Sequence, residues 1–412
     1  MREMKDSGIE WIGQIPKGWE LRRAKTLFTQ RNSKGNGIEV LLSPTQKYGV
    51  VPQSQLEGVV QVKEDTDLQM FKTVHKGDFV ISLRSFQGGF EYSLYEGVCS
   101  PAYQVFYPTS PICDTYYRYL FKSQSFISKM NNLTVGIREG KNIQYVDFAN
   151  SQIPVPPLAE QERIAAFLDA ECAEIDTVLE KTRASIEEYK KLKQAVITQA
   201  VTKGIRGDRP MKDSGIEWIG EISQDFEIVK LKWLCDVLDQ FRSPVTADKR
   251  NQNADVLYDY YGASGAIDKI DGYTIDDHVM LIGEDGANLR MRNLPIMYEI
   301  NGKAWVNNHA HILKPKAGVD FYFIFYALEA LDLNYYITGS AQPKLSQDNL
   351  RNIWVPITAL TEQKRIAAYI SDVCDEFDCL IAKKQQYLTE IENYKKSLIY
   401  EYVTGKKEVL PL

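Results

Sequence analysis

The sequence lacks the features that would place it in a membrane or outside the cell. In this chain of 412 residues the longest apolar run, around 321–331, is far shorter than the roughly 20 residues that a membrane helix needs. The N-terminus has neither the basic nor the apolar section of a signal peptide. With 44% hydrophobic and 25% charged residues, the composition is that of a soluble globular protein, and we expect it in the cytoplasm.

The sequence is also poor in patterns that bind metals or form disulfides. None of its six cysteines stands in a CxxC pair, and its four histidines are scattered. His309 and His311 are close in sequence, and we favour a structural or surface role for them over metal binding. We therefore expect reduced, mostly buried thiols and no metal site.

Motifs for catalysis are missing as well. A methyltransferase that acts on an amino group needs an Asp/Asn-Pro-Pro-aromatic loop, whereas the one Pro-Pro here, Pro156-Pro157, follows valine and precedes leucine. This pair is more typical of the start of a helix. No GxxxxGK[ST] phosphate loop occurs. A self-sufficient methyltransferase or nuclease and an ATP-driven enzyme are therefore disfavoured, and we expect no catalytic residues.

What the sequence does contain is an internal repeat. The nonapeptide KDSGIEWIG occupies Lys5–Gly13 and recurs without change at Lys212–Gly220. A second pair, EQERIAAFL at Glu160–Leu168 and EQKRIAAYI at Glu362–Ile370, is separated by 202 positions. The stretches between these motifs are almost unrelated to each other. The two halves therefore share these repeated motifs, which we call the frame, and differ in the stretches between them.

Each of the second motifs opens a segment with helical periodicity. Apolar residues from Ile164 to Val196, and again from Ile366 to Leu398, recur at helical spacing, with charged residues on the other faces. A helix that packs on its own domain is one explanation. The length and the repetition favour two long helices in an antiparallel coiled coil, which would place the variable stretches at opposite ends about a pseudo-twofold axis.

The variable stretches predict mixed α/β domains of about 150 residues each. Short strands are expected at 78–82, 102–107, 278–282 and 311–313, and helices near 116–129 and 321–331. We therefore predict an α+β protein with a pseudo-twofold internal repeat. Its expected segments are a first variable domain (1–157), a first long spacer helix (158–204), a second variable domain (205–359), and a second long spacer helix with a C-terminal tail (360–412).

Two different surfaces on one repeated frame suit the recognition of an asymmetric, two-part target, and DNA is the natural candidate. The net charge of −6 argues against strong phosphate binding by this chain alone. Residues 1–157 carry 18 basic and 15 acidic residues, whereas residues 205–359 carry 16 and 22. The repeated motifs would also offer a partner protein two equivalent docking places.

These motifs resemble the framework segments of type I restriction-modification specificity subunits. The resemblance rests on KDSGIEWIG at the start of each half and on P-L-x-E-Q-x-x-I-A at Pro157–Ala165. The second pattern is less complete at Leu360–Ala367, where Thr358-Ala359 stands in place of Pro-Pro. The resemblance implies two target-recognition domains, each followed by a long helix, that recognise double-stranded DNA without catalysis.

The resemblance also implies partners. It predicts two methyltransferase (M) subunits that carry S-adenosylmethionine and flip and methylate an adenine in each half-site, and restriction (R) subunits that use ATP and Mg. The M subunits could supply part of the phosphate contact that this acidic chain lacks. We expect no cofactor on the chain itself.

Candidate DNA-binding residues lie on loops flanked by glycine. Forked donors that could read base edges are Arg84 and Gln87, before Gly88-Gly89, and Arg290 and Arg292, near Gly286. Phosphate contacts are predicted on the loops after Gly136 and Gly339, at Arg138, Lys141, Gln342 and Lys344. Surface salt bridges are the alternative role for each of these residues.

Candidate frame or partner-docking residues lie in the repeated motifs: Trp11, Trp218, Glu160, Gln161, Glu362 and Gln363. The two halves should read different sequences, so identity between them argues for packing or M docking rather than base stacking. Two other interpretations remain open. A stand-alone DNA-binding regulator or anti-restriction protein predicts a more basic surface, and a coiled-coil protein scaffold would tolerate similar domains in both halves.

Overall fold

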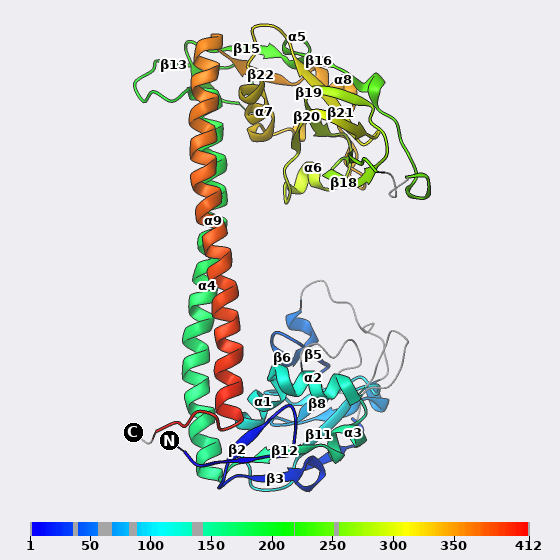
Figure 1. The fold of residues 1–412 in the computed structure, drawn as a ribbon, viewed down its shortest axis with the longest axis vertical. Coiled ribbons are helices and arrows are strands. Elements are labelled where there is room, and N and C mark those ends of the chain that lie inside the picture. Colours follow the sequence, from blue (N-terminus) through cyan, green and yellow to red (C-terminus); the bar gives the residue numbers. More distant parts are fainter. Residues whose placement is uncertain are drawn as a thin grey trace. The chain divides into compact units, whose positions relative to one another are not determined.

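The computed structural model describes residues 2–35, 40–56, 68–81, 89–133, 143–217, 219–250 and 255–410. The chain forms two compact units, one of residues 1–183 with 386–412 and the other of residues 184–385 (Figure 1). Both unit boundaries fall inside the two long helices, α4 (Leu158–Lys203) and α9 (Leu360–Val403). In the described part of the chain, no helix has an apolar stretch long enough to cross a membrane.

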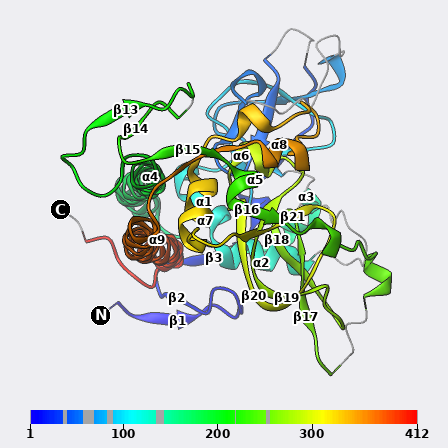
Figure 2. The ribbon, with the colours of Figure 1, turned by 90° about the horizontal axis from the view of Figure 1, so that it is seen from above.

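Within each unit, half of α4 packs antiparallel to half of α9, and the two helices lie side by side when viewed end-on (Figure 2). In the first unit, Lys395 Nζ lies 2.6 Å from Asp176 Oδ1. In the second unit, Lys193 Nζ lies 2.7 Å from Asp378 Oδ1. Because each partner is displaced by 202 positions, the two ion pairs are equivalent under the repeat. The predicted antiparallel helix pair and internal repeat are confirmed.

The first unit is built around an antiparallel four-stranded sheet with the order β4-β11-β8-β9. Its core is rich in buried phenylalanine, including Phe28, Phe79, Phe106 and Phe121; the Phe79 and Phe106 rings stack, and Phe28 meets Phe79 and Phe106 edge-on. The strands are β1 (Met4–Asp6), β2 (Gln14–Pro16), β3 (Glu20–Arg23), β4 (Phe28–Arg31), β5 (Leu42–Thr45), β6 (Gly49–Pro52), β7 (Lys72–Val74), β8 (Phe79–Ile81), β9 (Glu91–Tyr92), β10 (Gly97–Cys99), β11 (Gln104–Pro108) and β12 (Gln152–Val155). The α-helices before α4 are α1 (Asp114–Lys122), α2 (Gln124–Leu133) and α3 (Tyr145–Asn150).

The second unit is built around a six-stranded sheet with the order β16-β21-β19-β20-β17-β18. Helix α7 packs between this sheet and the long helices (Figure 1). The strands are β13 (Met211–Asp213), β14 (Glu221–Ser223), β15 (Glu227–Lys230), β16 (Cys235–Val237), β17 (Tyr258–Gly262), β18 (Gly265–Ile270), β19 (Ile275–Gly283), β20 (Met297–Val306), β21 (Ala310–Pro315) and β22 (Trp354–Ile357). The shorter α-helices are α5 (Leu231–Leu234), α6 (Asn288–Met291), α7 (Phe321–Ala330) and α8 (Gln347–Arg351).

The two sheets share a common register despite their different sequences. Phe28 pairs with Pro108 between β4 and β11, and Cys235 pairs with Pro315 between β16 and β21. Both partners are displaced by 207 positions, which is also the displacement of the nonapeptide. By the same register, Gln104 at the start of β11 is equivalent to His311 near the start of β21.

The predicted elements are present, with one difference in the first unit. The helix expected over 116–129 is divided into α1 and α2 at Ser123, which has extended backbone angles. The Ser123 hydroxyl donates to the Leu120 carbonyl at 2.7 Å, so it satisfies a carbonyl at the end of the first helix. The expected α+β class is confirmed.

Candidate nucleic-acid interface

Two loops of the second unit lie against each other beside the start of β21. The first, residues 284–292, follows β19 and includes the short helix α6, and the second, residues 338–346, precedes α8. Leu345 N donates to Glu284 O at 2.7 Å, and Gly286 N donates to Pro343 O at 3.1 Å. The fold therefore brings together candidates that are about 50 residues apart in the sequence, namely Arg290, Arg292, Gln342 and Lys344.

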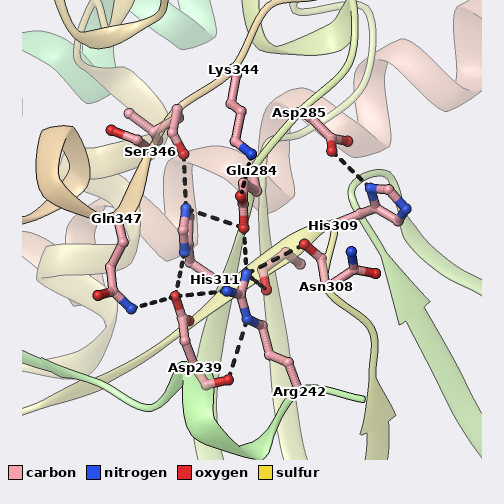
Figure 3. Close-up of polar contacts among 12 residues, drawn as sticks. Asp239, Arg242, Glu284, Asp285, Asn308, His309, His311, Lys344, Ser346 and Gln347 are labelled. Carbon is pink, nitrogen blue, oxygen red and sulfur yellow. Dashed lines mark hydrogen bonds and ion pairs between the residues drawn. The ribbon is translucent and has the colours of Figure 1, made fainter. Parts of the chain in front are cut away.

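A polar network lies beneath these two loops (Figure 3). His311 is fully buried, with Nδ1 2.6 Å from Asp239 Oδ2 and Nε2 2.8 Å from Leu345 O. Asp239 also accepts hydrogen bonds from Ile312 N at 3.0 Å and from Gln347 Nε2 at 2.8 Å. The carboxylate therefore joins β21 to the first turn of α8.

Two cations complete this network around Glu284. Arg242 forms an ion pair with Glu284, and Lys344 Nζ lies 3.0 Å from the other carboxylate oxygen. Burial alone would raise the pKa of Glu284, but the hydrogen bonds from Arg242 and Lys344 outweigh it and lower that pKa. The pKa of Asp239 is lowered in the same way, because the hydrogen bond and charge of His311 outweigh the effect of burial.

The four candidates on these loops differ in their availability to a ligand. Arg290 and Gln342 are exposed, and Arg290 uses one terminal nitrogen to bind the Ile337 carbonyl at 3.0 Å. Lys344 is exposed and paired with Glu284. Arg292 instead donates to the carbonyls of Glu329 and Leu331 at 2.9 Å each, so it caps the end of α7. Base reading by Arg292 would require both of these hydrogen bonds to break.

The first-unit candidates Arg84, Gln87, Arg138 and Lys141 lie outside the described residues. In the described part of the first unit, amide side chains surround Gln104, the position equivalent to His311. Gln104 accepts from Gln30 Nε2 at 2.9 Å and donates to Gln144 Oε1 at 2.8 Å. Gln144 is the residue before α3, as Ser346 is before α8. The same place in the frame therefore holds different chemistry in each unit.

The predicted frame residues make equivalent contacts in both units. Glu160 receives hydrogen bonds from Arg2 at 2.9 Å and from the Trp19 indole at 3.0 Å. Its counterpart, Glu362, is paired with Arg209, which is displaced from Arg2 by the repeat interval of 207 positions. These carboxylates attach the start of each long helix to the segment that carries the nonapeptide.

The neighbouring glutamines repeat this pattern. Gln161 accepts from Cys113 N at 2.9 Å and donates to Pro156 O at 2.8 Å. Gln363 accepts from Asp320 N at 2.8 Å and donates to Thr358 O at 2.6 Å. Both side chains are buried. Within the described structure these residues therefore serve the frame, and a role in M docking stays a prediction.

The tryptophans of the nonapeptide are described in only one copy. Trp11 is half-buried and meets Phe126 edge-on, with ring centroids 5.8 Å apart. Trp218 lies outside the described residues. The packing of Trp11 agrees with an anchoring role in the first unit.

The sequence missed His311 and Asp239 as central residues of the second unit. A histidine within the apolar segment Ala310–Leu313 was the available signal, because a buried imidazole needs polar partners. Those partners come from segments 34 to 72 positions away, which spacing cannot reveal.

The part of the chain that the structure describes has no group of three or more His, Cys, Asp or Glu arranged to hold a metal ion. The six cysteines are free, and four of them are buried.

The two units share equivalent frame contacts at Gln161 and Gln363 and differ in the hydrogen bonds at Gln104 and His311. The family model "Type I restriction modification DNA specificity domain" matches residues 16–188 and 223–392. The chain therefore belongs to this family of type I restriction-modification specificity subunits.

Individual relatives agree with this assignment. The type I restriction enzyme MjaVIII specificity subunit of Methanocaldococcus jannaschii is 28% identical over 295 residues, which are 66% of this chain and 66% of that protein. A chain solved in work on complex assembly and conformational transition of the type I R-M system has a TM-score of 0.71 at 16% identity, covering 95% of this chain and 99% of that one. The HsdS subunit of Thermoanaerobacter tengcongensis has a TM-score of 0.50 at 16% identity, covering 98% and 100%.

Proposed function

We propose that this chain is the subunit that gives a type I restriction-modification complex its DNA sequence specificity. Each unit would read one half of an asymmetric, two-part site. The single observation that carries this proposal is the contrast between the repeated frame contacts and one equivalent strand position in the two sheets. The contacts of Gln161 and Gln363 are the same, whereas the equivalent positions Gln104 and His311 have unrelated partners.

The proposal assigns the chain segments as follows. Residues 1–157 and 205–359 form the two target-recognition domains, and residues 158–204 and 360–412 form the two spacer segments. The loops that carry Arg290, Gln342 and Lys344 would contact DNA in the second half. Arg84, Gln87, Arg138 and Lys141 would do so in the first half.

The chain would act in the cytoplasm. It would determine which DNA sequence the complex binds and would take no part in catalysis. Two M subunits would dock on the repeated frame and bring S-adenosylmethionine, and R subunits would join with ATP and Mg. The charge of the chain supports this assignment. Because its net charge is −6, its affinity for DNA would rise when partner subunits contribute phosphate contacts.

The proposal is tested by co-expression with the candidate M subunit in a host that lacks adenine methylation. Modified adenines are then mapped across the genome by long-read sequencing. We expect one motif with two specified parts and a fixed gap of unspecified bases. A motif with one part would contradict the two-reader assignment. A soluble complex that binds S-adenosylmethionine but leaves no modification would contradict the function.

A further inference from the structure

The segment between β19 and β20, residues 284–296, keeps two apolar side chains exposed. Its Leu289 and Ile296 are buried in the core of the second unit, whereas Met291 is 66% exposed and Leu294 is 53% exposed. Single exposed apolar residues are common on protein surfaces. These two differ from such residues because hydrogen bonds hold the segment that carries them in one arrangement.

One side chain closes the turn over residues 288–295 from within. Asn288 Nδ2 donates to the carbonyls of Leu294 and Pro295 at 3.0 Å and 3.1 Å. Asn288 Oδ1 accepts from Leu294 N at 2.9 Å. The backbone of Leu294 is therefore bound at both its N–H and its carbonyl, and its side chain stays exposed while its main chain is fixed.

The end of α7 holds the same turn from outside. Arg292 donates to the carbonyls of Glu329 and Leu331 at 2.9 Å each. The carboxylate of Glu329 accepts from Ile296 N at 3.1 Å and from Met297 N at 2.9 Å. Arg292 has a φ of 50°, in the left-handed region that residues with a side chain rarely adopt. The turn is thus fixed on both sides of its exposed apolar residues.

The surroundings of this turn are those of a DNA-reading surface. Arg290, directly before Met291, is exposed, as are Gln342 and Lys344 on the adjoining 338–346 loop. Gly286 N donates to Pro343 O at 3.1 Å and joins the two loops. In the major groove of DNA, the apolar group that a base presents is the C5-methyl of thymine. Apolar side chains held beside donors to DNA therefore fit thymine.

We propose that Met291 and Leu294 read thymine in the half-site of the second unit, by packing against its C5-methyl group. Arg290 would identify a base by its hydrogen-bond acceptors, whereas these two side chains identify thymine by apolar contact. The inference rests on the proposed function, because it assigns a base to one of two DNA-reading surfaces. Each half-site offers a thymine to test, opposite the adenine that M would methylate.

The test uses the complex of this chain with its M subunit and duplexes that carry the mapped two-part site. Each thymine of the site is replaced in turn by uracil, which pairs with adenine in the same way and lacks only the C5-methyl group. We expect uracil to lower the affinity about fourfold at one or two positions of one half-site, the factor for one buried methyl group. Equal affinities for all of these duplexes would overturn the inference.

The variant that combines Met291→Gln with Leu294→Asn connects this effect to the two side chains. It keeps their approximate size and makes them polar, and because both are exposed we expect it to fold normally. It should bind the thymine duplex about fourfold more weakly for each contact that is lost, with no further loss on uracil. Met291→Leu combined with Leu294→Met stays apolar and should keep the uracil effect. A polar variant with the wild-type uracil effect would contradict the proposal.

Trp233→Gln is the matched control. Trp233 is 67% exposed on α5, which lies at the opposite end of β21 from the two loops, where Lys316 N donates to Leu234 O at 2.9 Å. This variant should bind every duplex as the wild type does.

The outcomes separate this inference from the proposed function. A polar variant that weakens assembly with M, while uracil has no effect in the wild type, would make this turn a protein-docking surface and sink the inference. A wild-type complex that binds no two-part site would refute the proposed function itself. A complex that binds such a site with equal affinity for thymine and uracil would refute only the reading of thymine.

Discussion

At the scale of single residues, the two copies of the frame separate what is constant from what varies. Gln161 and Gln363 are identical and bind equivalent backbone groups. Arg290 and Arg292 stand two positions apart, yet one is exposed and the other caps α7. Exposure and existing partners therefore decide which arginine remains available to DNA.

Arg290 provides the sharpest test of base reading in the second unit. Arg290→Ala should cost about 1–3 kcal/mol of binding free energy to the cognate duplex and relax specificity at one base position, because a forked donor to a base edge would be lost. Affinity and methylation patterns of the complex with M measure this effect. Lys364→Ala, on an exposed position of α9, is the control and should change neither. A uniform loss on all DNA sequences would assign Arg290 to phosphate instead.

Glu91 makes the stability of the first unit depend on pH. Burial raises the pKa of Glu91 from 4.5 to about 7, although Lys122, 2.6 Å away, opposes this shift. The folded protein thus holds a proton that the unfolded chain has already released between these two values. The contribution of Glu91 to the free energy of unfolding is therefore fully present below about pH 4.5 and is lost as the pH rises through about 7.

The variant Glu91→Gln isolates this contribution. Between about pH 5 and pH 7 the wild-type protein should lose about 2 kcal/mol of unfolding free energy relative to the variant, measured by chemical denaturation. Glu96→Gln, at an exposed position of the same unit, should follow the wild-type curve. Parallel curves for wild type and Glu91→Gln would show that Glu91 is already ionised throughout this range.

At the scale of elements, α4 and α9 are held in place mainly by the buried apolar residues along one side of each helix, which we call the apolar seam. Leu168 and Ile370 are fully buried and belong to the cores of the first and second units, respectively. The equivalent ion pairs Asp176–Lys395 and Asp378–Lys193 instead lie partly in water. Exposed ion pairs contribute little to stability, because their attraction is screened by water and salt.

The seam and the ion pairs can be compared directly in the first unit. Leu168→Ala should lower the free energy of unfolding by about 3 kcal/mol, since it removes buried contacts and leaves a cavity. Asp176→Ala should lower it by less than about 1 kcal/mol. Denaturant titration of both variants measures the difference. An equal loss for the two would mean that the ion pairs set the helix pairing.

At the scale of the whole molecule, net charge predicts how this chain depends on its partners. The chain carries 55 acidic and 49 basic residues, so its electrostatic field does not favour binding of a polyanion such as DNA. We expect weak DNA binding by the chain alone and tight binding by the complex with M. The complex should also show the steeper loss of affinity with salt, because it would displace more counterions from the phosphates.

This prediction is measured by titrating a labelled cognate duplex at several salt concentrations, with the chain alone and with the complex. A duplex that lacks the mapped site serves as the control for binding without specificity. Equal affinities and equal salt slopes with and without M would favour a stand-alone DNA-binding regulator over a subunit.

The sequence by itself determined the repeat, the two long helices and the α+β class, because these follow from local periodicity and from literal identity between motifs such as those around Glu160 and Glu362. It also singled out Arg290, Gln342 and Lys344, since glycine marks loops and forked or charged donors mark DNA contacts. The predicted base-reading and phosphate-binding roles of these residues still await the measurements above.

Only the tertiary structure decided which of these residues share a surface and which already have partners. Spacing could not show that Arg292 caps α7, nor that His311 lies between Asp239 and Leu345, because those contacts join segments far apart in the sequence. The physical reason is that the role of a buried polar group depends on its hydrogen-bond partners, and the fold decides which groups lie within hydrogen-bond distance. Local pattern fixes the elements, and burial and long-range pairing fix the chemistry of the site.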